Sequence, residues 1–286
     1  MGVVLITGCS SGFGLETALA FARNGDTVVA TMRNLDKSTA LRERAADGGL
    51  EIQIEQLDVT DDASVEAGVA ATMKRHGTVD ALVNNAGLGH RAPVETMSID
   101  TAMRVMDTNF WGAMRMIRAV LPMMRERRSG VIVNVSSIAS RLPALPYNTM
   151  YAASKSALNA SSEALAGEMA LYGIRVVSIE PGFFDTEVTA NTPTRGESVG
   201  DAYAADVQWF QSFADASVSN GAAPGRVADV IVAAVADRDT PLHLPVGDDA
   251  AMYLEMFRGV DSYEGWVDGV VVPTVEQAVG PRPTLD

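Results

Sequence analysis

Short apolar runs rich in β-branched residues alternate with longer helical patterns through the first 180 residues of this chain. The strand-like runs are residues 3–7, 27–31, 51–57, 79–84, 131–135 and 175–179. The helical patterns cover residues 12–23, 36–46, 61–75, 98–127 and 149–171. Strands that are apolar throughout and separated by helices indicate a parallel sheet covered on both faces. The alternation therefore predicts an α/β fold with a doubly wound parallel sheet, in which the crossovers are right-handed.

The pattern changes after Pro181. Residues 183–222 show no clear periodicity and carry Phe183, Phe184, Trp209, Phe210 and Phe213. We expect a helix from about Pro224 and a seventh strand over residues 242–246, whereas the tail from Asp248 has no clear pattern. Within the helical pattern 98–127, Pro122 is expected to disturb the last turns.

No linker or shift in composition divides the first 180 residues, and we expect a single Rossmann-type domain over residues 1–286. Its core would be residues 2–182, followed by a lid over residues 183–222. Residues 223–286 would add a C-terminal helix, a strand and a tail.

Composition excludes several classes of protein. The net charge of −14 argues against a nucleic-acid partner, which would require a basic surface. No apolar run reaches the roughly 20 residues of a membrane span. Cys9 is the only cysteine, and residues 2–7 read as a strand and not as a signal peptide. We therefore expect a cytoplasmic protein with no membrane and no nucleic-acid partner. The three histidines have no ligand spacing, so no metal is expected.

A glycine-rich turn joins the first strand to the first helix. Its sequence is Thr7-Gly8-Cys9-Ser10-Ser11-Gly12-Phe13-Gly14. Glycines allow the backbone to turn tightly and to approach a pyrophosphate, and the helix N-terminus presents N–H groups to it. The spacing G-x-x-x-G-x-G differs from the common G-x-G-x-x-G fingerprint. The turn predicts a dinucleotide site, and the alternative is a tight connection without a ligand.

Further motifs follow the glycine turn in order. They are Asn84-Asn85-Ala86-Gly87 after the fourth strand, Asn109, Ser136-Ser137 after the fifth strand, Tyr151-Ala152-Ala153-Ser154-Lys155, and Pro181-Gly182 after the sixth strand. Over roughly residues 2–190 this series resembles the short-chain dehydrogenase/reductase family. The segments 7–14, 29–33 and 85–89 look like those of 17β-hydroxysteroid and retinol dehydrogenases.

The resemblance implies hydride transfer between a nicotinamide dinucleotide and an alcohol or ketone, with Asn109, Ser137, Tyr151 and Lys155 as the catalytic residues. Tyrosine has an ordinary pKa of about 10, and a nearby cation lowers it. Lys155 follows Tyr151 by four residues, which places both side chains on one side of a helix. By resemblance, Ser137 orients the substrate oxygen, Lys155 also binds the nicotinamide ribose, and Asn109 holds a water that links Lys155 to solvent.

The position of the serine departs from the family pattern. The family places its serine thirteen residues before the tyrosine, whereas Ser137 precedes Tyr151 by fourteen. We expect a one-residue insertion between residues 139 and 146 and assign the role to Ser137. Ser136 and Ser140 are the alternatives.

Residues 28–34 determine the expected cofactor. They contain no acidic residue that would bind a ribose 2′-hydroxyl. By resemblance, Arg33 stands where related NADP-dependent enzymes carry their phosphate-binding arginine, whose planar fork suits a phosphate. The sequence therefore predicts NADP(H), with NAD(H) as the alternative. The full set of expected cofactor contacts is Gly8, Ser10, Ser11, Gly12, Phe13, Gly14, Arg33, Asp58, Val59, Asn85, Ala86, Gly87, Tyr151, Lys155, Pro181, Gly182, Phe184 and Thr186.

A bulky hydrophobic secondary alcohol or ketone is the expected substrate, because the residues near the strand ends are largely apolar. The expected substrate contacts are Ser137, Leu145, Tyr147, Tyr151 and Phe183. The alternatives are a catalytically silent, dinucleotide-sensing regulator of the same fold, and the same fold performing enoyl reduction or dehalogenation. The intact motif residues argue against each. By resemblance, helices 98–127 and 151–171 would form a homodimer or homotetramer.

Overall fold

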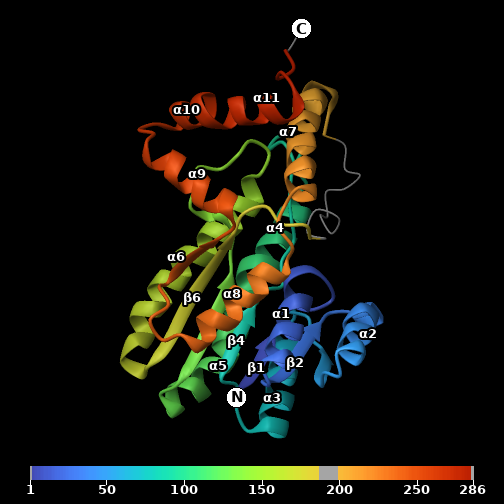
Figure 1. The fold of residues 1–286 in the computed structure, drawn as a ribbon, viewed down its shortest axis with the longest axis vertical. Coiled ribbons are helices and arrows are strands. Elements are labelled where there is room, and N and C mark those ends of the chain that lie inside the picture. Colours follow the sequence, from blue (N-terminus) through green and yellow to red (C-terminus); the bar gives the residue numbers. More distant parts are fainter. Residues whose placement is uncertain (1, 187–198, 285–286) are drawn as a thin grey trace.

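The computed structural model describes residues 2–186 and 199–284. Their strands form one parallel sheet in the order β3-β2-β1-β4-β5-β6-β7 (Figure 1). The strands are β1 (Val3–Ile6), β2 (Thr27–Met32), β3 (Ile52–Gln56), β4 (Ala81–Asn84), β5 (Gly130–Val135), β6 (Ile174–Pro181) and β7 (His243–Val246). The order reverses between β1 and β4, which is the position where sheets of this kind bind ligands. The predicted doubly wound fold is confirmed, including its seventh strand.

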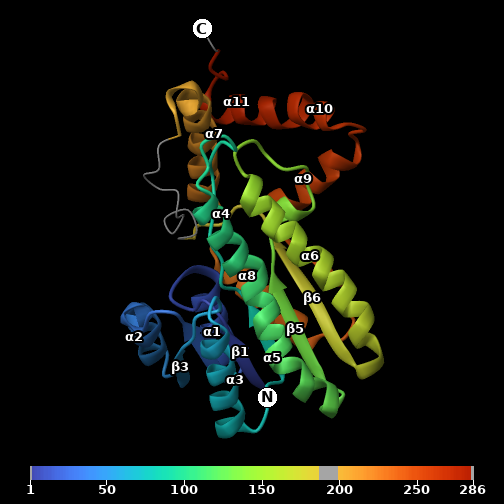
Figure 2. The ribbon, with the colours of Figure 1, turned by 180° about the vertical axis from the view of Figure 1, so that it is seen from behind.

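Helices cover both faces of the sheet (Figures 1 and 2). One face packs against α1 (Gly12–Arg23), α2 (Thr39–Asp47) and α8 (Gly225–Ala236), and the other against α3 (Asp62–His76), α5 (Gly112–Arg127) and α6 (Thr149–Met169). Neighbouring strand residues face opposite cores, so Ile6 packs with α1 and Leu5 with α5. Short 3₁₀ turns lie at Leu35–Ser38, Ile138–Ser140 and Ala170–Tyr172.

The helical pattern 98–127 is interrupted earlier than expected. It divides into α4 (Ile99–Met106), a π-helical turn at Asp107–Trp111, and α5, which continues through Pro122 to Arg127. Pro122 and Arg118 both lie on the exposed side of α5, where water can bind the Arg118 carbonyl that proline leaves without a donor. The expected disturbance at Pro122 was therefore wrong.

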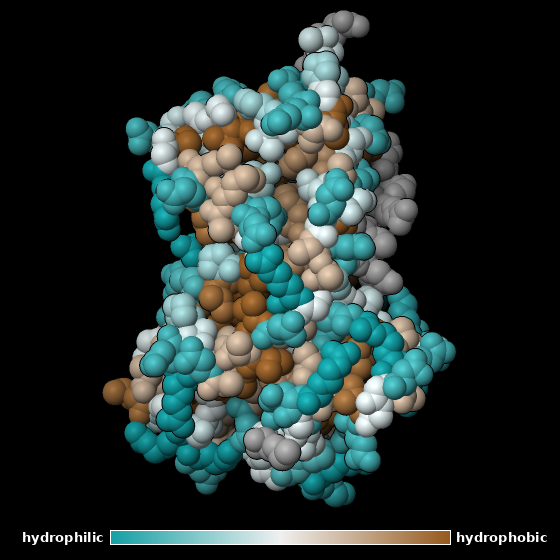
Figure 3. All heavy atoms as spheres, viewed as in Figure 1, coloured by the Kyte–Doolittle hydropathy of each residue, from teal (hydrophilic) through white to brown (hydrophobic). Residues whose placement is uncertain are grey.

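A separate helical layer covers the carboxyl ends of the strands (Figure 1). It consists of α7 (Asp201–Ser219), α9 (Asp248–Arg258), α10 (Tyr263–Trp266), a π-helical turn at Val267–Val271, and α11 (Val272–Val279). These helices share a third apolar cluster centred on Trp209, Phe210, Phe213 and Trp266. Figure 3 shows hydrophobic residues at the surface of this layer, where Met252 and Met256 are exposed. Part of the expected lid, residues 187–198, lies outside the described residues.

The C-terminal segment is fastened to α7 by Arg282. Its guanidinium donates two hydrogen bonds of 2.8 Å to the Asp206 carboxylate and lies 5.7 Å from the ring centroid of Trp209. The Tyr147 hydroxyl donates to the same carboxylate at 2.5 Å. The chain end and the loop before α6 therefore meet at one side chain. No helix within residues 2–186 and 199–284 is long and apolar enough to cross a membrane.

Candidate active site

Thr7 and Asn85 hold the turn after β1 against the turn after β4. The Thr7 hydroxyl oxygen accepts from the main-chain N–H groups of Asn85 and Ala86 at 3.0 and 3.1 Å. The Asn85 amide donates to the carbonyls of Thr7 and Gly8 at 2.9 and 3.1 Å. Gly8 has a φ of +73°, and a Cβ there would lie 2.8 Å from the Ala86 Cα. Only glycine fits this contact without a shift of the backbone.

The N-terminus of α1 forms a cradle beside this turn. A Cβ on Gly14 would overlap the Gly8 carbonyl and the Asn85 amide, and Gly12 has a φ of +54°. The N-cap side chain of Ser11 makes no capping hydrogen bond. The first N–H groups of α1 are therefore available to an anion, so the turn fits the pyrophosphate of a dinucleotide.

Lys155, Tyr151 and Ser137 meet at the carboxyl end of β5. The Lys155 ammonium donates to the Val135 carbonyl at 2.8 Å and lies 5.8 Å from the Tyr151 ring centroid. Burial lowers the pKa of Lys155 to about 8. Burial raises the pKa of Tyr151, and a hydrogen bond with the Ser137 side chain opposes that rise. The three side chains thus form one group that can exchange a proton with a bound oxygen atom.

The two neighbouring serines face away from Tyr151. The Ser136 hydroxyl donates to the Lys155 carbonyl at 3.3 Å. The Ser140 hydroxyl donates to the Ser137 carbonyl at 2.5 Å and accepts from Asn159 at 2.7 Å. Ser137 is therefore the serine of the three whose hydroxyl contacts Tyr151. The longer connection to Tyr151 contains the turn Ile138–Ser140 and a positive φ of 66° at Tyr147.

Asn109 lies in the π-helical turn and anchors the loop after β4. Its amide donates to the Leu88 carbonyl at 2.9 Å and to the Ser154 hydroxyl at 3.0 Å, and its oxygen accepts from the Leu88 N–H at 2.7 Å. A Cβ on Gly87 would lie 3.5 Å from the Asn109 oxygen and 3.6 Å from the Lys155 ammonium. Asn109 thus holds the loop next to Lys155.

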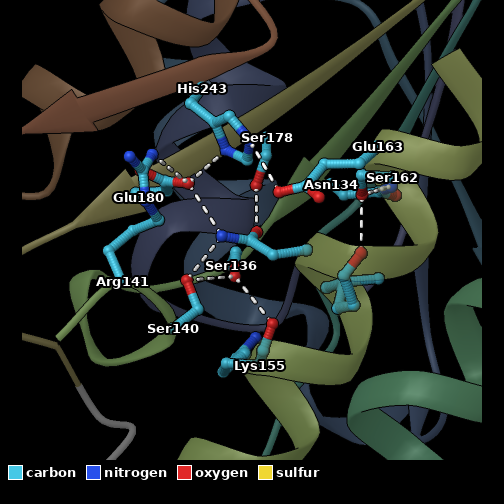
Figure 4. A network of polar contacts seen from close by, with 12 residues as sticks. Asn134, Ser136, Ser140, Arg141, Lys155, Ser162, Glu163, Ser178, Glu180 and His243 are labelled. Atoms are coloured by element: carbon cyan, nitrogen blue, oxygen red, sulfur yellow. Dashed lines mark hydrogen bonds and ion pairs between the residues drawn. The ribbon is translucent and has the colours of Figure 1, made fainter. Parts of the chain in front are cut away.

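A buried polar network lies behind the serine turn (Figure 4). Glu180, which is fully buried, accepts from Asn159 at 2.8 Å and from Arg141 at 3.2 Å, and lies 2.7 Å from the His243 ring nitrogen Nδ1. Because Asn159 also donates to Ser140, the network reaches the turn that carries Ser137 in two steps. Nothing in the spacing of these residues along the chain marks them as neighbours.

One cavity of about 1270 Å³ joins these features. Seventeen of the eighteen expected cofactor contacts line it, as do Ser137, Leu145 and Phe183. Gly14 is absent from the described lining because it packs behind the turn against Gly8 and Asn85. Asn109 is likewise not among the described residues that line the cavity.

Tyr147 corrects one expectation about the substrate. It is not among the described residues that line the cavity, because its hydroxyl is directed to Asp206. Burial and the hydrogen bond to this carboxylate raise the pKa of Tyr147 to about 12. Tyr147 therefore packs the lid and does not face the cavity.

Other lining residues were missed from the sequence. Asn34 and Lys37 stand beside Arg33, and Trp266, Val275 and Tyr253 line the opposite end. Valine recurs at every fourth position from 267 to 279, a spacing typical of a helix. This pattern could have predicted the C-terminal helical segment that the sequence analysis left unassigned.

A doubly wound sheet with a glycine-rich turn beside a tyrosine and a buried lysine defines a dinucleotide-dependent oxidoreductase. The family model described as short chain dehydrogenase matches residues 2–196, and the chain belongs to this family. Human retinol dehydrogenase 8 is 44% identical over 188 residues, which cover 64% of this chain and 59% of that protein. This chain thus aligns with about three fifths of that relative's length.

Solved structures of short-chain dehydrogenases and ketoreductases share this fold. A short-chain dehydrogenase from Streptomyces avermitilis has a TM-score of 0.77 at 32% identity, over 94% of this chain and 97% of the other. A variant of actinorhodin polyketide ketoreductase, solved with NADPH, has a TM-score of 0.73 at 29% identity, over 87% and 97% of the two chains.

The buried network yields a stability prediction. Glu180→Ala leaves the Asn159 amide and the His243 ring without their buried acceptor, so we expect the free energy of unfolding to fall by about 3 kcal/mol or more. Glu163→Ala removes the exposed partner of the same histidine and should cost less than about 1 kcal/mol. Urea denaturation of both variants measures the difference. Equal, small losses would show that the network does not support the fold.

Proposed function

We propose that this protein is an NADP(H)-dependent oxidoreductase that interconverts a bulky hydrophobic secondary alcohol and the corresponding ketone. The observation that carries the proposal is the contact of Ser137 with Tyr151 above the buried Lys155 ammonium, in the cavity that also contains the glycine turn. Bound NADPH would supply a hydride to the carbonyl carbon.

The chain's own residues would handle the oxygen. In the reductive direction, the Tyr151 hydroxyl donates its proton to the oxygen as negative charge develops there. Ser137 donates a hydrogen bond to the same oxygen and fixes its position. The Lys155 ammonium stabilises the tyrosinate that remains, because an adjacent cation favours the charged form of the phenol. Oxidation of the alcohol reverses these steps.

The preference for NADP(H) rests on the charges at one end of the cavity. Arg33 and Lys37 both line it and are exposed, and an Arg fork suits a phosphate. Asp58, the acidic residue in the lining nearby, lies after β3, and one of its carboxylate oxygens, Oδ1, accepts two hydrogen bonds from Thr60 at 2.9 and 2.7 Å.

The silent-regulator alternative fits less well. A sensor of dinucleotides needs the glycine turn and Arg33, but it gains nothing from Ser137 directed at Tyr151. It would also retain the free-energy cost of burying Lys155, which a neutral residue would avoid.

We also propose a homo-oligomer formed through the helices that flank the π-helical turn. Ile99, Met103 and Trp111 expose 65%, 64% and 54% of their surface along this stretch. Large apolar side chains that are exposed close together in the sequence are the residues an interface would cover.

Tyr151→Phe removes the proton donor and keeps the ring. We expect kcat for ketone reduction to fall by about 10²- to 10⁴-fold, with NADPH binding largely retained. Tyr172→Phe, which makes the same change outside the described lining, should leave turnover unchanged. Near-normal turnover by Tyr151→Phe would refute the mechanism.

Arg33→Ala tests the cofactor preference. The loss of a charge-assisted contact should weaken NADPH binding by about 10- to 100-fold and leave NADH binding nearly unchanged. Arg23→Ala, at the far end of α1, is the matched control and should alter neither. Wild-type protein that binds NADH as tightly as NADPH would contradict the preference.

Light scattering tests the assembly. We expect a mass of two or four chains of 30.2 kDa, and Trp111→Glu should lower it because a buried charge would oppose association. A wild-type mass of one chain would exclude the oligomer.

A further inference from the structure

Arg91 places a cation in the wall of the part of the cavity assigned to the substrate. It follows Gly87, which lies beside Lys155, by four residues. Its Nη1 donates to the Phe210 carbonyl at 3.1 Å and to the Gln211 side-chain oxygen at 3.3 Å. Both acceptors belong to α7, and Arg91 and both of these residues line the cavity.

The charge of Arg91 is not matched by a close carboxylate among the described residues. Its two acceptors are neutral, and Asp215 acts on it only at longer range. Asp215 is exposed and accepts from Gln211 at 2.6 Å. Burial lowers the pKa of Arg91, but a guanidinium stays charged in proteins. The hydrogen bonds above use Nη1, which leaves the donors of Nε and Nη2 without a partner among residues 2–186 and 199–284.

Apolar side chains line much of the cavity into which Arg91 faces, although Gln211 and Asp215 line it too. The apolar residues include Leu142, Leu145, Phe183, Phe213, Trp266 and Val275. A charge that lies among apolar side chains is costly unless an opposite charge pairs with it. The guanidinium fork matches a carboxylate in shape and forms paired, charge-assisted hydrogen bonds with it.

We propose that Arg91 binds the carboxylate of an amphipathic substrate, so that the alcohol or ketone is carried on a bulky apolar acid. This inference rests on the proposed function, because it names the substrate class of that site. Four residues of extended chain span at most about 14 Å, so one fatty chain can reach from the reacting carbon beside Lys155 to Arg91. The aromatic side chains then cover the chain between the two ends.

A binding experiment tests the carboxylate site without turnover. Wild-type protein saturated with NADP⁺ is titrated with dodecanoate and with dodecanamide, its uncharged counterpart of the same length, by calorimetry. We expect dodecanoate to bind about 10-fold more tightly or better. Arg91→Gln should remove this ratio, Arg91→Lys should keep part of it, and Arg238→Gln, an equal charge change on an exposed turn, should keep all of it.

The ratio of the two affinities, for dodecanoate and for dodecanamide, distinguishes an Arg91 that binds the carboxylate from one that only supports the fold. A merely structural Arg91 would lower binding of the acid and the amide equally in Arg91→Gln and leave their ratio unchanged, which would overturn the proposal. A ratio near one in the wild-type protein, which needs no variant to fold, would overturn it as well.

Turnover distinguishes this proposal from the proposed function. Long-chain oxo acids and their methyl esters are compared as substrates, and kcat/KM should favour the acid by about 10-fold in the wild type and by little in Arg91→Gln. Reduction of the esters without preference for the acids would refute the Arg91 site and leave the reductase intact. Binding of dodecanoate through Arg91 with no reduction of either series would support the site and refute the reductase.

Discussion

The buried ammonium of Lys155 is the constraint around which the site is built. The protein gives it one strong acceptor, the Val135 carbonyl, and places Gly87 and the Tyr151 ring beside it. Because the pKa of Lys155 is near 8 in the folded chain and near 10.5 when unfolded, its burial opposes folding at neutral pH by about 3 kcal/mol. This cost is fully present below pH 8 and disappears as the pH rises from 8 to 10.5. A cation retained at that cost indicates a function, and stabilising a tyrosinate is one that needs it.

The sheet explains why residues far apart in the chain can surround this lysine. Parallel strands direct their carboxyl ends to one edge, so the turns after β1, β4, β5 and β6 converge there. The reversal of strand order between β1 and β4 opens the crevice in which the glycine turn and Asn85 interlock. Helices α7 and α9–α11 then close the same edge from above (Figure 1). The dinucleotide end and the apolar end of one cavity thus share a single rigid support.

Much of the fold could be predicted from local sequence patterns. The strands and the first helix could be predicted because each has a clear periodicity and, in α1, a glycine turn at its start. The family followed from motifs whose order along the chain is fixed. The extra residue before Tyr151 meant that the sequence could not decide which of the three serines contacts the tyrosine. The structure distinguishes them, because the hydroxyls of Ser136 and Ser140 are hydrogen-bonded elsewhere. Tyr147 could not be assigned from sequence, since its partner Asp206 lies 59 residues away.

The helical layer over the carboxyl ends of the strands was harder to predict from sequence, for a physical reason. Helices α9–α11 are held by contacts with α7 and by Arg282, so their order depends on tertiary packing more than on local propensity. The network of Glu180 was hidden for the same reason, because it joins β6, β7, α6 and the serine turn across the sheet.

Tracing the hydride tests the central claim most directly. Wild-type protein is given NADPH deuterated at the transferable position and a bulky apolar ketone, and the product is analysed by mass spectrometry and NMR. The account predicts an alcohol with one deuterium on the carbinol carbon for each NADPH oxidised, and a hydroxyl proton that comes from solvent. Binding of NADPH without formation of deuterated alcohol from any member of a ketone panel would contradict it.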